Sequence, residues 1–138
     1  VITSNGVVGV VRKVSPSFSS VISLLNKRIG ISAKIKKSDY YGMVIWEGGN
    51  YAKATLKEIP NHVDIQKGDT IITSGYSAIF PEGIVIGKIT RYEIEEGGNF
   101  YEITIELSTN FKTLSHVYIV SNLMRKEQLE LEKTTEND

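Results

Sequence analysis

The residues from Lys67 to Gly87 decide how this chain is expected to fold. They read Lys67-Gly68-Asp69-Thr70-Ile71-Ile72-Thr73-Ser74-Gly75, then Tyr76-Ser77-Ala78, then Ile79-Phe80-Pro81-Glu82-Gly83-Ile84-Val85-Ile86-Gly87. A turn leads into a short apolar strand that stops at a glycine, and a second turn starts another strand. Pro81 fixes its own φ, Gly83 can adopt positive φ, and Gly87 inside a strand indicates a bulge or a close backbone contact. The pattern predicts a corner of a small β-barrel.

Strand signals of the same kind continue in both directions from this stretch. Short runs of β-branched and aromatic residues are bounded by turn residues, which is typical of hairpins and barrels. In residues 102–107, Ile103, Ile105 and Leu107 alternate with polar residues, which favours an antiparallel sheet with one buried face. The fold class is therefore predicted to be all-β, built from small antiparallel β-barrel subdomains. The predicted strands are Val7–Val14, Val21–Leu25, Ile31–Lys36, Tyr41–Trp46, Ala52–Ile59, Thr70–Thr73, Ile84–Tyr92, Tyr101–Leu107 and Val117–Val120.

Internal repetition predicts how these strands are divided. We expect residues 1–37 to form a partial first β-barrel subdomain and residues 38–122 to form a complete second one. Residues 123–138 contain good helix formers and a polar end, so we expect a helical or disordered C-terminal tail. The paired segments, in chain order, are Val1–Ser4 with Ile71–Ser74, Gly6–Val11 with Gly83–Ile89, Val21–Leu25 with Ile103–Leu107, and Ile31–Ile35 with Val117–Val120.

Composition narrows the functional classes. The chain of 138 residues is 41% hydrophobic and 23% charged, as expected of a globular domain with a real core. No apolar run approaches the roughly 18 residues that span a bilayer. Cysteine is absent, which excludes disulfides, thiolate metal sites and a cysteine nucleophile. The abrupt start at Val1, without a signal peptide, leads us to expect a piece of a longer protein.

Charge is balanced overall but divided along the chain. The 16 basic and 16 acidic residues cancel, which argues against nucleic acid as the main partner. Residues 1–70 hold ten Lys/Arg and five acids, whereas residues 71–138 hold six Lys/Arg and eleven acids. This uneven distribution of charge has two explanations. Either it favours head-to-tail self-association, or the charged side chains simply cover strand faces that are in contact with water.

A Ser/His/Asp triad is the most specific enzymatic alternative, because chymotrypsin-like proteases are also built from two small barrels. The protease-type signature Gly-Asp-Ser-Gly is absent, and no segment predicts the aimed N–H groups of an oxyanion hole. The two histidines lack metal-ligand spacing, and no phosphate-binding Gly-x-x-x-x-Gly-Lys loop is present. We therefore assign no catalytic, cofactor-binding or metal-binding residue, and expect no cofactor. The triad would draw on His62 or His116, Asp64 or Asp69, and Ser74 or Ser77.

A binding module without enzymatic activity is a further alternative. Four aromatic residues, Tyr40, Tyr41, Trp46 and Tyr51, either form a stacking platform for sugars or bases or fill the core and edges of a β-domain. An unrelated β-barrel adaptor for a small ligand or peptide would show a concave apolar pocket with convergent polar groups.

Several short motifs in combination resemble the family of rod-shape-determining protein MreC. The string Lys67-Gly68-Asp69, Thr73-Ser74-Gly75, Phe80-Pro81-Glu82-Gly83 and Ile86-Gly87 is similar to the characteristic family string. Gly6–Val11, Val14-Ser15-Pro16 with Ser19, and Asn110-Phe111-Lys112-Thr113-Leu114 resemble further family elements. The resemblance covers about residues 1–122. It implies that the motif residues act as structural residues, namely Gly6, Gly9, Gly68, Asp69, Ser74, Gly75, Phe80, Pro81, Gly83, Gly87 and Phe111.

The resemblance also implies a function. MreC-like proteins are non-enzymatic scaffolds that organise the cell-wall elongation machinery and rod cell shape through protein contacts. The implied partners are MreB, MreD, a RodA-like glycosyltransferase, a class B penicillin-binding transpeptidase and further copies of the same chain. The implied location is the extracytoplasmic side of the bacterial inner membrane, held by an N-terminal anchor helix that we expect to be missing from this chain.

Overall fold

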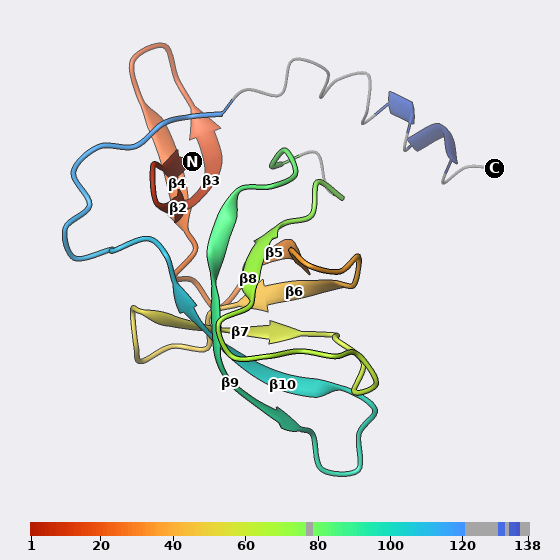
Figure 1. Ribbon diagram of the computed structural model, residues 1–138. Helices are drawn as coiled ribbons and strands as arrows, with labels where there is room; N and C mark the ends of the chain where they lie inside the picture. Colours follow the sequence, from red (N-terminus) through yellow and green to blue (C-terminus); the bar gives the residue numbers. More distant parts are fainter. Residues whose placement is uncertain (77–78, 121–129, 132, 136–138) are drawn as a thin grey trace.

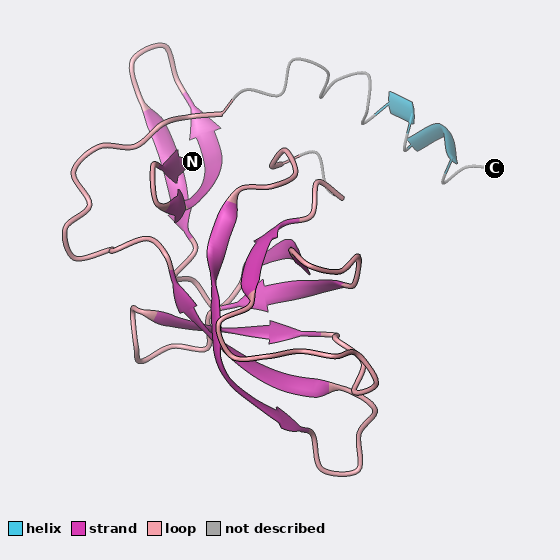
Figure 2. Cartoon of the chain, in the orientation of Figure 1, coloured by secondary structure: helices cyan, strands magenta, loops and turns pink. Residues whose placement is uncertain are grey.

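Ten β-strands make up nearly all of the regular structure in the computed structural model, which describes residues 1–76, 79–120, 130–131 and 133–135. Figure 1 and Figure 2 show a barrel with a smaller group of strands beside it. Within the described residues, no helix is both long and apolar enough to cross a membrane. The strands are β1 (Ile2–Thr3), β2 (Gly6–Val7), β3 (Gly9–Val14), β4 (Ser19–Ser23), β5 (Gly30–Ile35), β6 (Tyr41–Ile45), β7 (Lys53–Lys57), β8 (Thr70–Thr73), β9 (Val85–Ile94) and β10 (Tyr101–Leu107).

Six of the strands close into an antiparallel barrel in the order β10-β7-β6-β5-β8-β9. Period-2 alternation builds its core, because side chains of one parity point inward along each strand. Ile103, Ile105 and Leu107 of β10 are buried while Glu102 and Glu106 are exposed, as the sequence pattern predicted. The all-β barrel prediction is therefore confirmed.

Two short sheets, β1–β2 and β3–β4, contain the N-terminal strands. The β1–β2 sheet packs against β9 and the chain that follows β10. A Cβ atom added at Gly6 would lie only 2.6 Å from the carbonyl oxygen of Val85, so only glycine allows this approach. The buried Thr109 hydroxyl donates a hydrogen bond of 2.9 Å to the carbonyl oxygen of Val7. These contacts fix the N-terminal sheets on the barrel.

The repeat seen in the sequence has a counterpart in strand pairing. Ile71 pairs with Gly87 in the barrel, and Val1 makes reciprocal backbone hydrogen bonds with Gly9 of 2.8 and 3.3 Å. Both glycines lie against the next strand. An added Cβ would meet a backbone carbonyl oxygen there at 2.2 Å for Gly9 and 2.3 Å for Gly87. The segment from β1 to β4 therefore repeats the arrangement of β8, β9 and β10.

The two repeated units are β1–β4 and β8–β10, which we call the first and the second copy. Each copy pairs with the segment that follows the other copy. β5 comes after the first copy and pairs with β8, the first strand of the second. Tyr118 comes after the second copy and forms an isolated bridge with Ile2 in β1, through backbone hydrogen bonds of 2.9 and 2.7 Å. We call this arrangement the strand exchange.

The strand exchange corrects two sequence predictions. The barrel begins at Gly30, so the boundary expected between residues 37 and 38 is wrong, because β5 belongs to the barrel. The strand predicted at Val117–Val120 is also wrong, because only Tyr118 forms a bridge. Its partner β1 has just two residues, which leaves no room for a longer ladder. A partial first subdomain ahead of Gly30 stays a prediction.

The C-terminal tail is described only in part. Residues 121–129, 132 and 136–138 lie outside the described residues, so most of the tail prediction falls there. Glu130, Leu131 and residues 133–135 are helical, and the Thr134 hydroxyl donates a hydrogen bond of 3.0 Å to the carbonyl oxygen of Glu130. The described part is consistent with a helical tail.

Candidate protein-interaction surface

A hollow of about 370 Å³ lies on the outside of the barrel and is bordered by two exposed tyrosines. Tyr41 is 51% exposed and Tyr76 is 79% exposed, and their ring centroids lie 6.2 Å apart at an interplanar angle of 46°. We call this the tyrosine surface, which is lined by Ser32, Tyr41, Gly42, Met43, Glu58, Ser74 and Tyr76.

Strand alternation places the β6 side chains of the tyrosine surface. Gly42 and Val44 are buried, so Tyr41 and Met43 point to the outer face. A Cβ atom at Gly42 would lie 2.4 Å from the carbonyl oxygen of Lys57, so glycine lets β6 and β7 approach closely here. The tyrosine and methionine therefore stand on a rigid, hydrogen-bonded sheet.

The family motif holds the loop that carries Tyr76. The Thr73 hydroxyl donates a hydrogen bond of 2.7 Å to the carbonyl oxygen of Pro81 and accepts one of 2.9 Å from the backbone N–H of Ile84. Gly83 adopts positive φ (99°), as predicted, and its N–H donates a hydrogen bond to the Thr73 carbonyl oxygen at 3.0 Å. Phe80 is buried in the core. These contacts clamp both ends of the loop.

The middle of the same motif borders the tyrosine surface directly. Ser74 lines the hollow, and its hydroxyl oxygen accepts a hydrogen bond of 3.2 Å from the backbone N–H of Tyr76. Gly75 has positive φ (71°), and an added Cβ would lie 3.0 Å from the Cβ of Glu82. The loop therefore turns sharply where Tyr76 leaves the barrel.

Glu58 adds local backbone strain at the edge of the hollow. Its φ of 73° is positive, and it is the one non-glycine residue with positive φ among the described residues. Such a conformation costs on the order of 1 kcal/mol and persists only when the surroundings enforce it. Glu58 follows directly after β7, so the strain lies where the chain leaves the strand.

Ion pairs surround the tyrosine surface. Lys34 pairs with Glu82 and, at 3.7 Å, with Asp39. The hydrogen bond from Lys34 to Glu82 raises the pKa of Lys34 above its ordinary value. Lys57 Nζ lies 3.0 Å from Glu47 Oε1, and this hydrogen bond raises the pKa of Lys57. Each ion pair therefore favours the charged form of its lysine.

The start of the motif builds a separate turn before β8. Gly68 has positive φ (91°). Asp69 Oδ2 accepts a hydrogen bond of 2.8 Å from the backbone N–H of Gln66 and lies 2.9 Å from Lys37 Nζ. Asp69 thus shapes a turn and ties it to the turn between β5 and β6.

The remaining motif residues lie away from the tyrosine surface. Gly6 and Gly9 belong to the N-terminal sheets, and Gly87 lies in β9. Phe111 is partly buried against the core after β10. The motif residues therefore do not converge on one site.

The residues of the alternative catalytic triad are not brought together. The ring of His62 stacks edge-on against Tyr40, with its Nε2 3.4 Å from the tyrosine hydroxyl oxygen. His116 Nδ1 lies 3.1 Å from the hydroxyl oxygen of its neighbour Ser115, which was not a predicted member. Ser74 contacts the backbone of its own loop, and Ser77 lies outside the described residues. Among the described residues, no group of three or more His, Asp or Glu could hold a metal ion.

The four aromatic residues considered as a stacking platform also do not form one site. Trp46 Nε1 donates a hydrogen bond of 2.9 Å to the carbonyl oxygen of Asn50, and the ring of Tyr51 lies 4.8 Å from Lys112 Nζ. Of the four, only Tyr41 lines the hollow. Sequence reasoning missed its partner Tyr76, which stands two residues after Ser74 in the most informative stretch.

Comparison with known proteins identifies the family. Residues 1–121 match the family model described as "Rod shape-determining protein MreC, barrel core". The cell shape-determining protein MreC of Bacillus subtilis is 32% identical over 115 residues, which covers 76% of this chain and 39% of that protein. MreC of Listeria monocytogenes is 27% identical over 123 residues, which covers 87% of this chain and 42% of that protein. The chain thus spans about two fifths of the length of these relatives.

Solved structures share the fold. The structure of MreC from Listeria monocytogenes matches with a TM-score of 0.76 at 23% identity, covering 88% of this chain and 62% of that one. A structure described as a complex between penicillin-binding protein PBP2 and MreC from Helicobacter pylori matches with a TM-score of 0.66 at 21% identity, covering 84% and 72%. The barrel, the motif and the match over residues 1–121 together show that this chain belongs to the MreC family of rod shape-determining proteins.

Proposed function

We propose that the chain helps to determine cell shape as a non-enzymatic scaffold, and that the tyrosine surface binds a class B penicillin-binding transpeptidase. The observation that carries this proposal is the pair of exposed rings, Tyr41 and Tyr76, on a hollow that the family motif supports. The Helicobacter pylori relative is described in complex with a protein of the penicillin-binding class, which supports this choice of partner.

The chemistry of the tyrosine surface suits a protein partner. Tyrosine is enriched at interfaces because it buries a large apolar ring while its hydroxyl keeps a hydrogen bond. Met43 adds a flexible apolar side chain beside the rings. Tyr41 stands on a hydrogen-bonded strand and the backbone N–H of Tyr76 is bonded to the Ser74 hydroxyl, so less backbone entropy is lost when a partner binds.

Binding of the two tyrosine variants to the transpeptidase tests the proposal. Tyr76→Ala and Tyr41→Ala should each weaken the affinity by about tenfold or more, as expected of central aromatic residues. Tyr92→Ala is the matched control, since Tyr92 is also partly exposed but lies on β9 and packs edge-on against Tyr101. Biolayer interferometry with the extracytoplasmic part of the transpeptidase measures the dissociation constants. If Tyr41→Ala and Tyr76→Ala bind the transpeptidase with the same affinity as the control Tyr92→Ala, this surface is ruled out.

The same family membership supports a wider proposal. We propose that MreB, MreD and a RodA-like glycosyltransferase are further members of the assembly. The proposed location is the extracytoplasmic side of the inner membrane, with attachment through a segment outside this chain. In a bacterium whose own copy is depleted, the full-length protein should restore rod shape, and a Tyr41→Ala/Tyr76→Ala double variant should not.

Self-association is the second part of the proposal. Around the barrel, β5, β6 and β7 lie together and β8, β9 and β10 lie together. Residues 30–70 hold six Lys/Arg and five acids, whereas residues 71–107 hold two Lys/Arg and six acids, so the barrel has an acidic side but no strongly basic one. The opposite charge comes mainly from four basic residues in or beside the N-terminal sheets, namely Arg12, Lys13, Lys27 and Arg28. Among the described strands, β4 pairs only with β3, which leaves one edge of β4 open for another chain. Attraction between unlike halves is weakened by salt.

Sedimentation across protein concentration and ionic strength tests self-association. The expected result is an assembly that grows with concentration and loosens as salt rises. A monomer under all conditions would refute self-association for this chain. A salt-independent oligomer would refute the charge explanation alone.

A further inference from the structure

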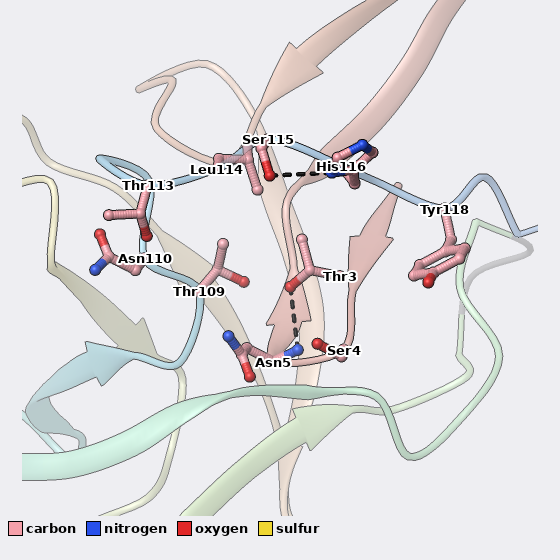
Figure 3. Close-up of a pocket in the computed structure, with 10 residues that line it drawn as sticks. All are labelled: Thr3, Ser4, Asn5, Thr109, Asn110, Thr113, Leu114, Ser115, His116 and Tyr118. Atoms are coloured by element: carbon pink, nitrogen blue, oxygen red, sulfur yellow. Dashed lines mark hydrogen bonds between the residues drawn. The ribbon is translucent and has the colours of Figure 1, made fainter.

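A second hollow lies where the N-terminal sheets meet the chain that follows β10. Its volume is about 240 Å³. Figure 3 shows the side chains of the β1–β2 turn, Thr3, Ser4 and Asn5, with those of residues 109–118 around them: Asn110 and Thr113 to the left, Ser115 and His116 above, and Tyr118 to the right. We call it the polar pocket, which is lined by Thr3, Ser4, Asn5, Thr109, Asn110, Thr113, Leu114, Ser115, His116 and Tyr118.

The polar pocket is rich in hydrogen-bonding groups and poor in charge. Nine of its ten lining side chains carry a hydroxyl, amide or imidazole group, and Leu114 is the exception. Among the described residues that line it, none is Asp, Glu, Lys or Arg. A phosphate or carboxylate ligand would be left without a cation, and a metal ion without an anionic ligand. Hydroxyl and amide groups can both donate and accept, as the hydroxyl groups of a neutral sugar require.

The walls of the polar pocket are fixed by contacts outside it. Thr109 is 4% exposed and is held by its hydrogen bond to Val7. Asn110 Oδ1 accepts a hydrogen bond of 3.1 Å from the backbone N–H of Lys112. Tyr118 is held by its backbone bridge to Ile2. A site of this kind is preorganised, which lowers the entropy lost when a ligand binds.

Several groups in the pocket remain free for a ligand. Within the part of the chain that the structure describes, the side-chain amide of Asn5 and the hydroxyl groups of Thr113 and Tyr118 make no hydrogen bond, whereas the backbone N–H of Asn5 donates one of 3.1 Å to the Thr3 hydroxyl oxygen. The ring of Tyr118 is 65% exposed. An aromatic face beside hydroxyl and amide groups suits a sugar, which presents apolar C–H groups on one side and hydroxyl groups around its edge.

We propose that the polar pocket binds one ring of a neutral carbohydrate chain. Thr113, Asn5 and the Asn110 amide nitrogen hydrogen-bond to the sugar hydroxyl groups, and the Tyr118 ring packs against its C–H face. Because the pocket joins the β1–β2 turn to residues 109–118, a bound sugar also strengthens the contact between the N-terminal sheets and the barrel. The polar pocket is separate from the tyrosine surface, so the test of carbohydrate binding is independent of the test of the proposed function.

NMR titration of the 138-residue chain tests the carbohydrate site. Chitotriose and maltotriose serve as neutral probes, and trigalacturonate serves as the charged control. We expect saturable shifts of the amide signals of Asn5, Thr113 and Tyr118 with a neutral probe at millimolar concentration, and none with trigalacturonate. Absence of saturable shifts with both neutral probes, shifts confined to another face, or equal binding of trigalacturonate would each overturn the proposal.

Two variants separate binding from folding. Thr113→Val keeps the shape of the side chain but removes its hydroxyl, and should weaken the affinity about three- to tenfold. Tyr118→Ser removes the ring and should abolish detectable binding. Ser20→Ala, on the exposed face of β4, is the matched control and should bind as the parent chain does. Thermal unfolding of each variant confirms that the fold is kept. A folded Thr113→Val and a folded Tyr118→Ser that both bind like the parent would overturn the site.

Discussion

Replacing Gly87 by alanine probes how closely β9 and β10 approach in the barrel. The added Cβ would lie 2.3 Å from the carbonyl oxygen of Glu106, whereas real Cβ atoms essentially never come closer than 3.0 Å to such an atom. The obstacle is backbone, so the strands themselves must move apart. Overpacking of this kind costs about 1–3 kcal/mol, and alanine returns about 0.4–1 kcal/mol by restricting the unfolded chain. The net expectation is a loss of about 1–2 kcal/mol in the free energy of unfolding.

Urea unfolding followed by circular dichroism measures this loss, and the melting temperature should fall by roughly 4–10 °C. Gly30→Ala is the matched control, because Gly30 is also a strand glycine but its new Cβ would meet the flexible Met43 side chain at 2.6 Å. A side chain can move aside where a backbone carbonyl cannot. If Gly87→Ala and Gly30→Ala unfold at the same urea concentration as the parent chain, the close-approach argument is refuted.

Three further predictions concern the loop and the edge of the tyrosine surface. Thr73→Val removes a hydroxyl that makes two hydrogen bonds, and should lower the free energy of unfolding by about 1–3 kcal/mol in urea titrations. Glu58→Gly relieves a positive φ worth about 1 kcal/mol but adds about 0.4–1 kcal/mol of unfolded-chain entropy, so that free energy should stay nearly unchanged in the same assay, and a loss above about 1 kcal/mol would contradict the strain argument. The folded-state pKa of Lys34 is raised above 10.5, so its pairing with Glu82 stabilises the fold below that pH and the benefit is lost as pH rises further. Melting curves up to pH about 12 should therefore show a steeper loss for the parent than for Lys34→Met.

Local patterns predicted the barrel strands well. Alternation in β10 identified Ile103, Ile105 and Leu107 as inward residues, because period 2 is a property of the strand itself. Gly83 and Gly87 were identified by what a turn and a close backbone contact require. The apolar run at Val117–Val120 has the same local signal, yet only Tyr118 forms a bridge. A strand needs a partner of matching length, and β1 is too short to supply one.

The arrangement of distant segments was harder to predict. The repeat was visible in the sequence, but nothing in it shows that β5 pairs with β8 while Tyr118 pairs with β1. The tyrosine surface was missed for a similar reason, since Tyr41 and Tyr76 become neighbours only when the barrel closes. Their residue types alone do not distinguish a surface pair from edge fillers.

The strand exchange has a consequence for the order of folding. β1 and β2 precede the barrel in the sequence, but Tyr118, which bridges to Ile2, and Thr109, whose hydroxyl binds the Val7 carbonyl oxygen, come about a hundred residues later. Contacts between such distant residues form slowly, because the intervening chain must first be ordered. The six barrel strands lie within residues 30–107, and their pairing does not need these contacts, whereas the local pairs β1–β2 and β3–β4 can complete their packing only when residues 109–118 are in place. The N-terminal sheets, which precede the barrel in the sequence, are thus expected to be the last to reach their native contacts.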